Sequence, residues 1–123
     1  MSAVIWVALG GAFGSVLRYL SGLLVSQYTA GYWGTLLVNL LGSLLIGIAA
    51  AYFSSRTDSP LLRLALMTGI LGGFTTLSAF SLELWQMLTT ERLLQAGLYM
   101  LATLVGAVLA TGCGWWLGRG LAA

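Results

Sequence analysis

The amino-acid sequence predicts an all-α membrane protein of four transmembrane helices, the third of them broken near its middle. Composition is the first reason: 59% of the 123 residues are hydrophobic and only 7% are charged. Soluble domains carry roughly a quarter charged residues, so this chain lacks the charge to cover a water-facing surface. We therefore expect residues 1–123 to form a single four-helix transmembrane domain surrounded by lipid.

Four apolar segments, the second reason, are each long enough to cross a bilayer, which takes about 20 helical residues. Short polar connections separate them, and the expected spans are residues 3–25, 32–53, 61–88 and 93–117. Pro60, the only proline, stands where the third helix should begin. The N-terminal segment lacks the charged start of a signal peptide, so we interpret it as a retained helix.

The third segment is longer than a straight crossing requires, and its middle contains Gly72-Gly73 followed by Thr75-Thr76. These residues are poor helix formers, and irregular backbone at membrane depth is tolerated only inside protein or beside a wet cavity. A broken helix is therefore predicted here, with an intact, closely packed helix as the alternative. Small residues spaced for close helix packing occur at Gly10 and Gly14, and at Gly106, Ala110, Gly114 and Gly118.

Charge distribution bears on assembly. The arginines divide three against two between the expected sides, Arg56, Arg63 and Arg119 against Arg18 and Arg92. So small a bias predicts insertion in both orientations. Four helices can hardly enclose a polar path alone, so we expect an oligomer, specifically an antiparallel, dual-topology dimer.

Several function classes lack the residues they need. The chain has no histidine, a single cysteine (Cys113), and three acidic residues that lie far apart in sequence, Asp58, Glu83 and Glu91. We therefore expect neither an enzyme nor a metal site built from side chains. A net charge of +2 is too small to indicate a nucleic-acid partner.

Polar groups inside the apolar segments are the functional candidates, because polar residues at membrane depth are costly. They are Asn39, a group of hydroxyls around Phe80 (Thr75, Thr76, Ser78 and Ser81), and Thr103 and Thr111 in the fourth segment. The alternatives are structural: an interhelical hydrogen bond for the amide, bonds back to the helix for the hydroxyls, a solvated carboxylate at Glu83, and a snorkelling Arg18.

Three motifs in order give these residues a context. They are GGAFGSVLRY at residues 10–19, GTLLVN at residues 34–39 followed by Gly42 and Gly47, and GILGGFTTLSAFSLE at residues 69–83. Together they resemble the CrcB/Fluc fluoride channels over nearly the whole chain. The resemblance implies passive export of fluoride across the cell membrane through two parallel pores of a dual-topology homodimer.

The resemblance also implies roles for particular residues. It places Asn39, Ser78, Phe80, Ser81 and Thr111 along the fluoride path. Glu83 falls in the vestibule, and Arg18 has a structural role. A structural sodium ion at the dimer centre would be held by the backbone carbonyls of Gly72 and Thr75.

The chain departs from the family pattern at three positions. Leu77 stands where the first of two phenylalanines is expected, Ala79 replaces a threonine, and Ala107 replaces a hydroxyl residue. One subunit of a heterodimeric fluoride channel is therefore an alternative to the homodimer. A small multidrug-type transporter and an assembly subunit without its own pore are further alternatives; the transporter would need a membrane-buried carboxylate, and Glu83 is the only candidate.

Overall fold

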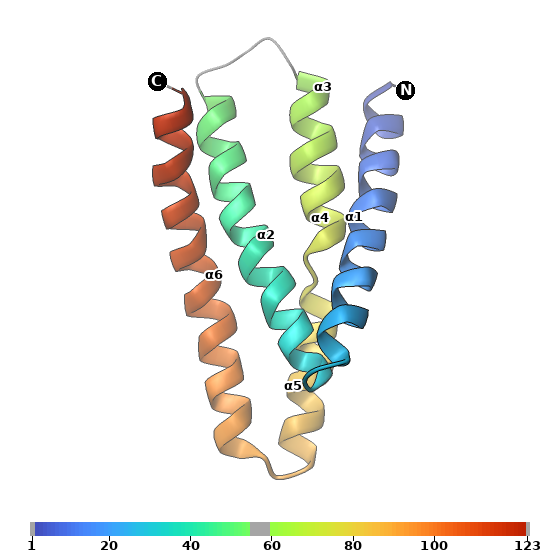
Figure 1. The fold of residues 1–123 in the computed structure, drawn as a ribbon, viewed down its shortest axis with the longest axis vertical. Helices are drawn as coiled ribbons and strands as arrows, with labels where there is room; N and C mark the ends of the chain where they lie inside the picture. Colours follow the sequence, from blue (N-terminus) through green and yellow to red (C-terminus); the bar gives the residue numbers. More distant parts are fainter. Residues whose placement is uncertain (1, 55–59, 123) are drawn as a thin grey trace.

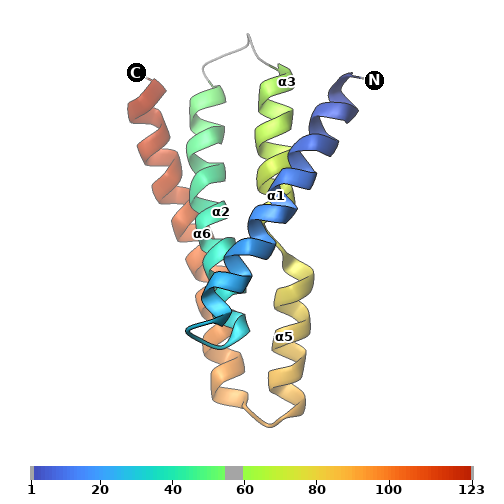
Figure 2. The same ribbon diagram turned by 45° about the vertical axis from the view of Figure 1, so that its right-hand side comes forward.

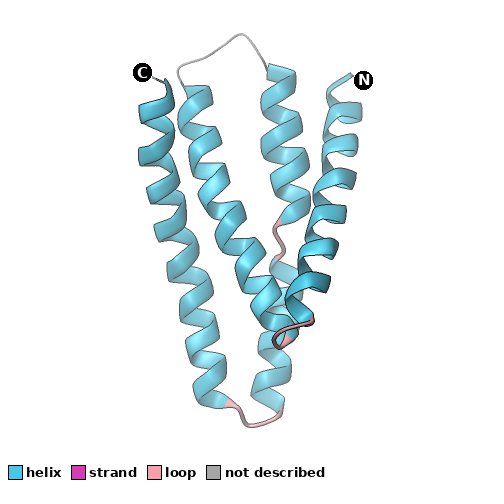
Figure 3. Ribbon diagram, in the orientation of Figure 1, coloured by secondary structure: helices cyan, strands magenta, loops and turns pink. Residues whose placement is uncertain are grey.

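The computed structural model describes residues 2–54 and 60–122, and these form helices joined by short turns (Figures 1 and 3). The helices are α1 (Ser2–Ser26), α2 (Gly31–Ser54), α3 (Pro60–Arg63), the π-helix η1 (Leu64–Leu71), α4 (Gly72–Phe74), α5 (Leu77–Thr89) and α6 (Leu93–Ala122). The segments α3, η1, α4 and α5 follow one another as the third span. All four spans are long and apolar enough to cross a membrane, which agrees with the predicted all-α fold of four transmembrane helices.

The spans run alternately up and down, with both chain termini at one end of the bundle (Figures 1 and 2). The helix pair with the most extensive contact is α2 with α6, while α1 packs against η1 and α4. The turn between α1 and α2 lies short of the turn between α5 and α6 along the long axis (Figure 2). One end of the bundle is therefore built mainly from α5, α6 and the start of α2.

Glycines bring the helix backbones into direct contact. A Cβ atom added at Gly114 would overlap the Leu44 carbonyl oxygen of α2, and one at Gly118 would lie 2.5 Å from the Ile48 carbonyl oxygen. Where α1 packs against η1, a Cβ at Gly14 would overlap the Ile70 carbonyl oxygen. The predicted close approach at these glycines is confirmed.

The third span is broken at Thr75 and Thr76, as predicted (Figure 3). Both residues are extended, with φ and ψ of −81° and 155° at Thr75 and −149° and 119° at Thr76. The Thr76 hydroxyl accepts a hydrogen bond from the Ala79 amide at 3.2 Å, and this N-cap starts α5. The π-helix before the break was not predicted from the sequence; the Gly72 amide donates to the Met67 carbonyl, five residues back.

The structure places the arginines less evenly between the two ends of the bundle than the division of three against two expected from the sequence. Arg63 ends α3 and Arg119 lies in the last turn of α6, at the end of the bundle that holds the termini. Arg92 precedes α6 at the opposite end, whereas Arg18 lies within α1, partly buried. Arg56 lies outside the described residues. Arg18 is thus part of a span and contributes little to an orientation count.

The contact at Gly114 predicts the effect of a substitution. We expect Gly114→Leu to lower the melting temperature of the detergent-purified protein, because its side chain would push α6 away from the Leu44 carbonyl; such overpacking costs about 1–3 kcal/mol. Gly112→Leu is the matched control, since a Cβ there meets nothing within 4 Å. Equal melting temperatures for the two variants would contradict the packing described here.

Candidate functional site

Asn39 holds the break in place from the neighbouring helix. Its side-chain nitrogen donates to the Thr76 carbonyl at 3.0 Å, and the Thr76 amide donates to the Asn39 Oδ1 at 2.8 Å. The side chain is 9% exposed. An extended residue at membrane depth needs partners for both its backbone groups, and Asn39 supplies both. The structure therefore shows the interhelical hydrogen bond that was the structural alternative for Asn39. The side-chain nitrogen carries a second N–H, which this hydrogen bond does not use.

A cavity of about 430 Å³, which we call the central cavity, lies beside the break. Its walls come from α2, the break and α6, and its lining includes Asn39, Ser43, Gly72, Thr75, Thr76, Leu77, Thr103 and Ala107. Two of the positions that depart from the family pattern, Leu77 and Ala107, therefore face the same space. Leu77 is 70% exposed, so the cavity opens at the surface of the chain beside it.

Thr103 is the polar side chain of α6 that reaches this cavity. It is 5% exposed, and its hydroxyl has no hydrogen-bond partner among residues 2–54 and 60–122. Buried hydroxyls are nearly always paired, so an unpaired one beside a cavity is a candidate ligand contact. Its oxygen is itself buried in this chain, and the side chain would have to turn to reach a ligand in the central cavity. Thr111, the residue expected from the resemblance, does not line the cavity; its carbonyl lies against Gly47 two turns further along α6.

Glu83 of α5 is hydrogen-bonded to side chains of both α2 and α6. Thr35 Oγ1 of α2 donates to one carboxylate oxygen at 2.8 Å, and the Tyr99 hydroxyl of α6 donates to the other at 2.6 Å. The sequence reasoning did not select Thr35 or Tyr99. A signal was available, because each lies four residues before another candidate, Asn39 or Thr103, and so shares its helix face.

Phe80 lies in α5, between Thr76 and Glu83 in the sequence. Its side chain is 5% exposed and its ring packs against the Tyr99 ring, with centroids 5.2 Å apart and planes inclined at 54°. Ser78 is exposed, with its hydroxyl 3.2 Å from that of Thr76, and Ser81 is exposed as well. Within one chain, Phe80 and Glu83 therefore share the partner Tyr99, and Asn39 contacts Thr76, whereas Ser81 is exposed.

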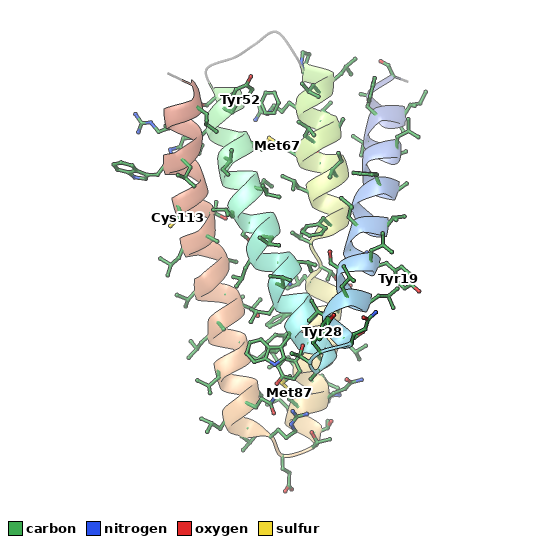
Figure 4. All side chains as sticks on the ribbon, viewed as in Figure 1. Tyr19, Tyr28, Tyr52, Met67, Met87 and Cys113 are labelled. Atoms are coloured by element: carbon green, nitrogen blue, oxygen red, sulfur yellow. The ribbon has the colours of Figure 1, made fainter. Side chains whose placement is uncertain are left out.

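Glu83 also lines a second cavity of about 510 Å³, the mouth cavity, at the end of the bundle formed by α5 and α6. Its lining consists of Gly31, Tyr32, Glu83, Gln86, Met87, Thr90 and Arg92, and Figure 4 labels Met87 at this end. Polar groups therefore follow one another from the mouth cavity, through the Glu83 cluster, to the central cavity.

The carbonyls of Gly72 and Thr75 lose their usual helical partners at the break. In an unbroken helix the Thr76 amide would donate to Gly72 and the Ala79 amide to Thr75. Here those amides donate to the Asn39 side chain and the Thr76 hydroxyl instead. Unwound carbonyls of this kind suit a sodium ion, and the described residues contain no group of acidic, histidine or cysteine side chains suited to a metal.

Arg18 approaches the break from the opposite side to the central cavity. It lines a cavity of about 300 Å³ together with Ser15, Thr35, Thr76 and Ala79. A positive charge therefore lies near the irregular backbone but outside the central cavity. This position suits the structural role expected for Arg18 better than a place on the expected fluoride path.

Comparison with known proteins identifies the family. The family model described as CrcB-like protein, Camphor Resistance (CrcB), matches residues 5–115. A protein of Hahella chejuensis named "Fluoride-specific ion channel FluC" is 43% identical over 114 residues, which cover 90% of each chain. Proteins of the same name from Sphingopyxis alaskensis and Agrobacterium fabrum are 41% and 45% identical, covering 100% and 94% of both chains respectively. These matches confirm the resemblance drawn from the three motifs, and the chain belongs to the CrcB family.

Proposed function

We propose that this protein is a fluoride-selective channel that lets fluoride leave the cell passively across the cell membrane. The observation that carries the proposal is the series of polar groups at membrane depth, from Glu83 to the unpaired Thr103 hydroxyl that lies buried beside the central cavity. The names of the relatives support the same function, and they describe ion channels rather than enzymes.

The chemistry of the polar line suits a small, strongly hydrated anion. Such an anion enters an apolar layer only if donors replace its water, and Thr103 and Asn39 supply neutral hydroxyl and amide donors. The edge of the Phe80 ring adds a positive partial charge. Conduction requires binding weak enough for release, and none of the described residues that line the central cavity is charged.

A second copy of the chain would complete the path. The central cavity opens at the surface beside Leu77, and Ser78 and Ser81 are exposed in a single chain. An antiparallel homodimer with two pores would bring such surfaces against a partner. A sodium ion between the copies, bound by the carbonyls of Gly72 and Thr75, would cross-link the two broken helices.

The position of Leu77 in the structure bears on the alternative of a heterodimer. Leu77 lies on the open side of the cavity, where the family pattern has a phenylalanine, so a divergent partner chain could supply the missing ring. A multidrug-type transporter is less well supported, because both oxygens of the Glu83 carboxylate are already bonded to hydroxyl donors.

Reconstitution of the purified chain alone tests the function. We expect liposomes that contain it to release fluoride and to retain chloride, because the path offers small neutral donors and no strong anion site. Efflux would be followed with fluoride-selective and chloride-selective electrodes, with protein-free liposomes as control. A folded chain that passes no fluoride by itself, but does so with a second CrcB-family chain, would favour the heterodimer.

Substitution of Thr103 tests the path. A hydrogen bond contributes about 1 kcal/mol, so we expect Thr103→Val to lower fluoride efflux several-fold, up to roughly tenfold. Thr103→Ser should restore it, because the hydroxyl returns. The melting temperature should not fall in the valine variant, since the lost hydroxyl has no partner among the residues that the structure describes. Thr111→Val is the matched control; a larger loss there than at Thr103 would contradict this assignment.

Substitution of Asn39 should affect both conduction and folding. In Asn39→Asp the carboxylate can accept from the Thr76 amide but cannot donate to the Thr76 carbonyl, and it puts a negative charge beside the anion path. We expect fluoride efflux to be abolished and stability to fall by about 1–3 kcal/mol, the cost of an unpaired buried group. Thermal melting and efflux measure the two effects. An unchanged melting temperature would contradict the role of Asn39 in holding the break.

A further inference from the structure

The mouth cavity contains a charged group besides Glu83 to which no role has been given. Of the residues that line it, Glu83 and Arg92 carry charge, and they come from α5 and from the turn before α6. We propose that Arg92 is a positioning residue for anion entry, whose fixed positive charge offsets the Glu83 carboxylate at the mouth. This inference rests on the proposed fluoride channel function.

Hydrogen bonds hold the Arg92 side chain in this position although the residue is exposed. Its Nε donates to the Gln95 Oε1 at 2.7 Å, and the Gln95 Nε2 donates to the Tyr32 hydroxyl at 2.6 Å. The Tyr32 ring meets the Tyr99 ring edge-on, with centroids 5.6 Å apart. Since Tyr99 donates to Glu83, one connected set of contacts links the guanidinium to the carboxylate.

The backbone restrains Arg92 as well. Its amide donates to the Met87 carbonyl at 2.9 Å, and its own carbonyl accepts from the Ala96 amide at 2.9 Å. The guanidinium has N–H groups beyond the one bonded to Gln95, and these have no hydrogen-bond partner among residues 2–54 and 60–122. The charge is therefore held at the cavity with donors left for a passing anion.

Electrostatics explains why such a charge would be needed. A carboxylate at the entrance repels an incoming anion, and its bonds to Thr35 and Tyr99 do not remove its charge. A positive charge on the same cavity wall reduces that repulsion and raises the local anion concentration, which increases the entry rate. Because Arg92 is exposed, salt should screen its effect, whereas the neutral donors deeper in the path should not depend on salt.

The experiment compares Arg92→Gln with the parent in fluoride efflux from liposomes at two ionic strengths set by an impermeant salt. At about 0.01 M and 1 M the screening lengths are about 30 Å and 3 Å. We expect efflux to fall several-fold at low salt and to match the parent at high salt, with chloride still excluded. Arg92→Lys should keep most of the low-salt efflux because it keeps the charge.

Arg119→Gln is the matched control, because it makes the same change in net charge at an exposed residue near the far end of α6, outside the lining of the mouth cavity. We expect it to leave efflux unchanged at both salt concentrations. An equal loss in Arg92→Gln at low and high salt, or no loss at either, would overturn the role of Arg92. A parent chain that passes no fluoride would overturn the channel function, and this inference with it.

Discussion

The pairing of the Asn39 side chain with both backbone groups of Thr76 is the interaction on which the centre of this molecule depends. An extended peptide inside an apolar bundle leaves an N–H and a C=O without helical partners, and each costs several kcal/mol in hydrocarbon. One primary amide satisfies both. Once the Thr76 amide is taken by Asn39 it is lost to Gly72, and the Thr76 hydroxyl takes the Ala79 amide from Thr75. The break and its two released carbonyls therefore have one cause.

Helix packing places Asn39 where it can do this. Glycines let the backbones of α2 and α6 touch in the half of the bundle that holds the termini, at Gly47 and Gly114. In the other half, large side chains such as Leu36, Phe80 and Tyr99 lie buried between the helices. Asn39 of α2 and Thr103 of α6, which lie between these two regions along their helices, line the central cavity.

Charge is distributed along the polar line in a way that suits movement of an anion. The central cavity is lined by neutral groups, and the charges lie at its borders: Arg18 behind the break, and Glu83 with Arg92 at the mouth. A fixed positive charge at the centre would hold an anion tightly and slow its release. Exposed charges at an entrance act mainly on the rate of encounter. Under the proposed channel function, attraction of the anion and its passage would therefore depend on different residues.

The sequence by itself determined the features that depend on composition and local pattern. Apolar runs gave the four spans, which the observed helices extend by a few residues, and Thr75-Thr76 after two glycines located the break. The spacing of Gly10, Gly14, Gly114 and Gly118 correctly indicated close packing. Family motifs singled out Asn39, Phe80 and Glu83; in the structure Asn39 bonds to Thr76, and both Phe80 and Glu83 contact Tyr99.

Only the tertiary structure decided which polar side chains meet. Thr103 and Thr111 lie two turns apart on the same helix, and only the packing of α6 against α2 and the break shows that Thr103 lines the central cavity. The Thr35–Glu83–Tyr99 cluster joins residues up to 64 positions apart in three helices, and the π-helix packs against α1. The physical reason is that helix periodicity determines which residues share a face, whereas contacts with neighbouring helices, including the close contacts at glycines, determine which way that face points.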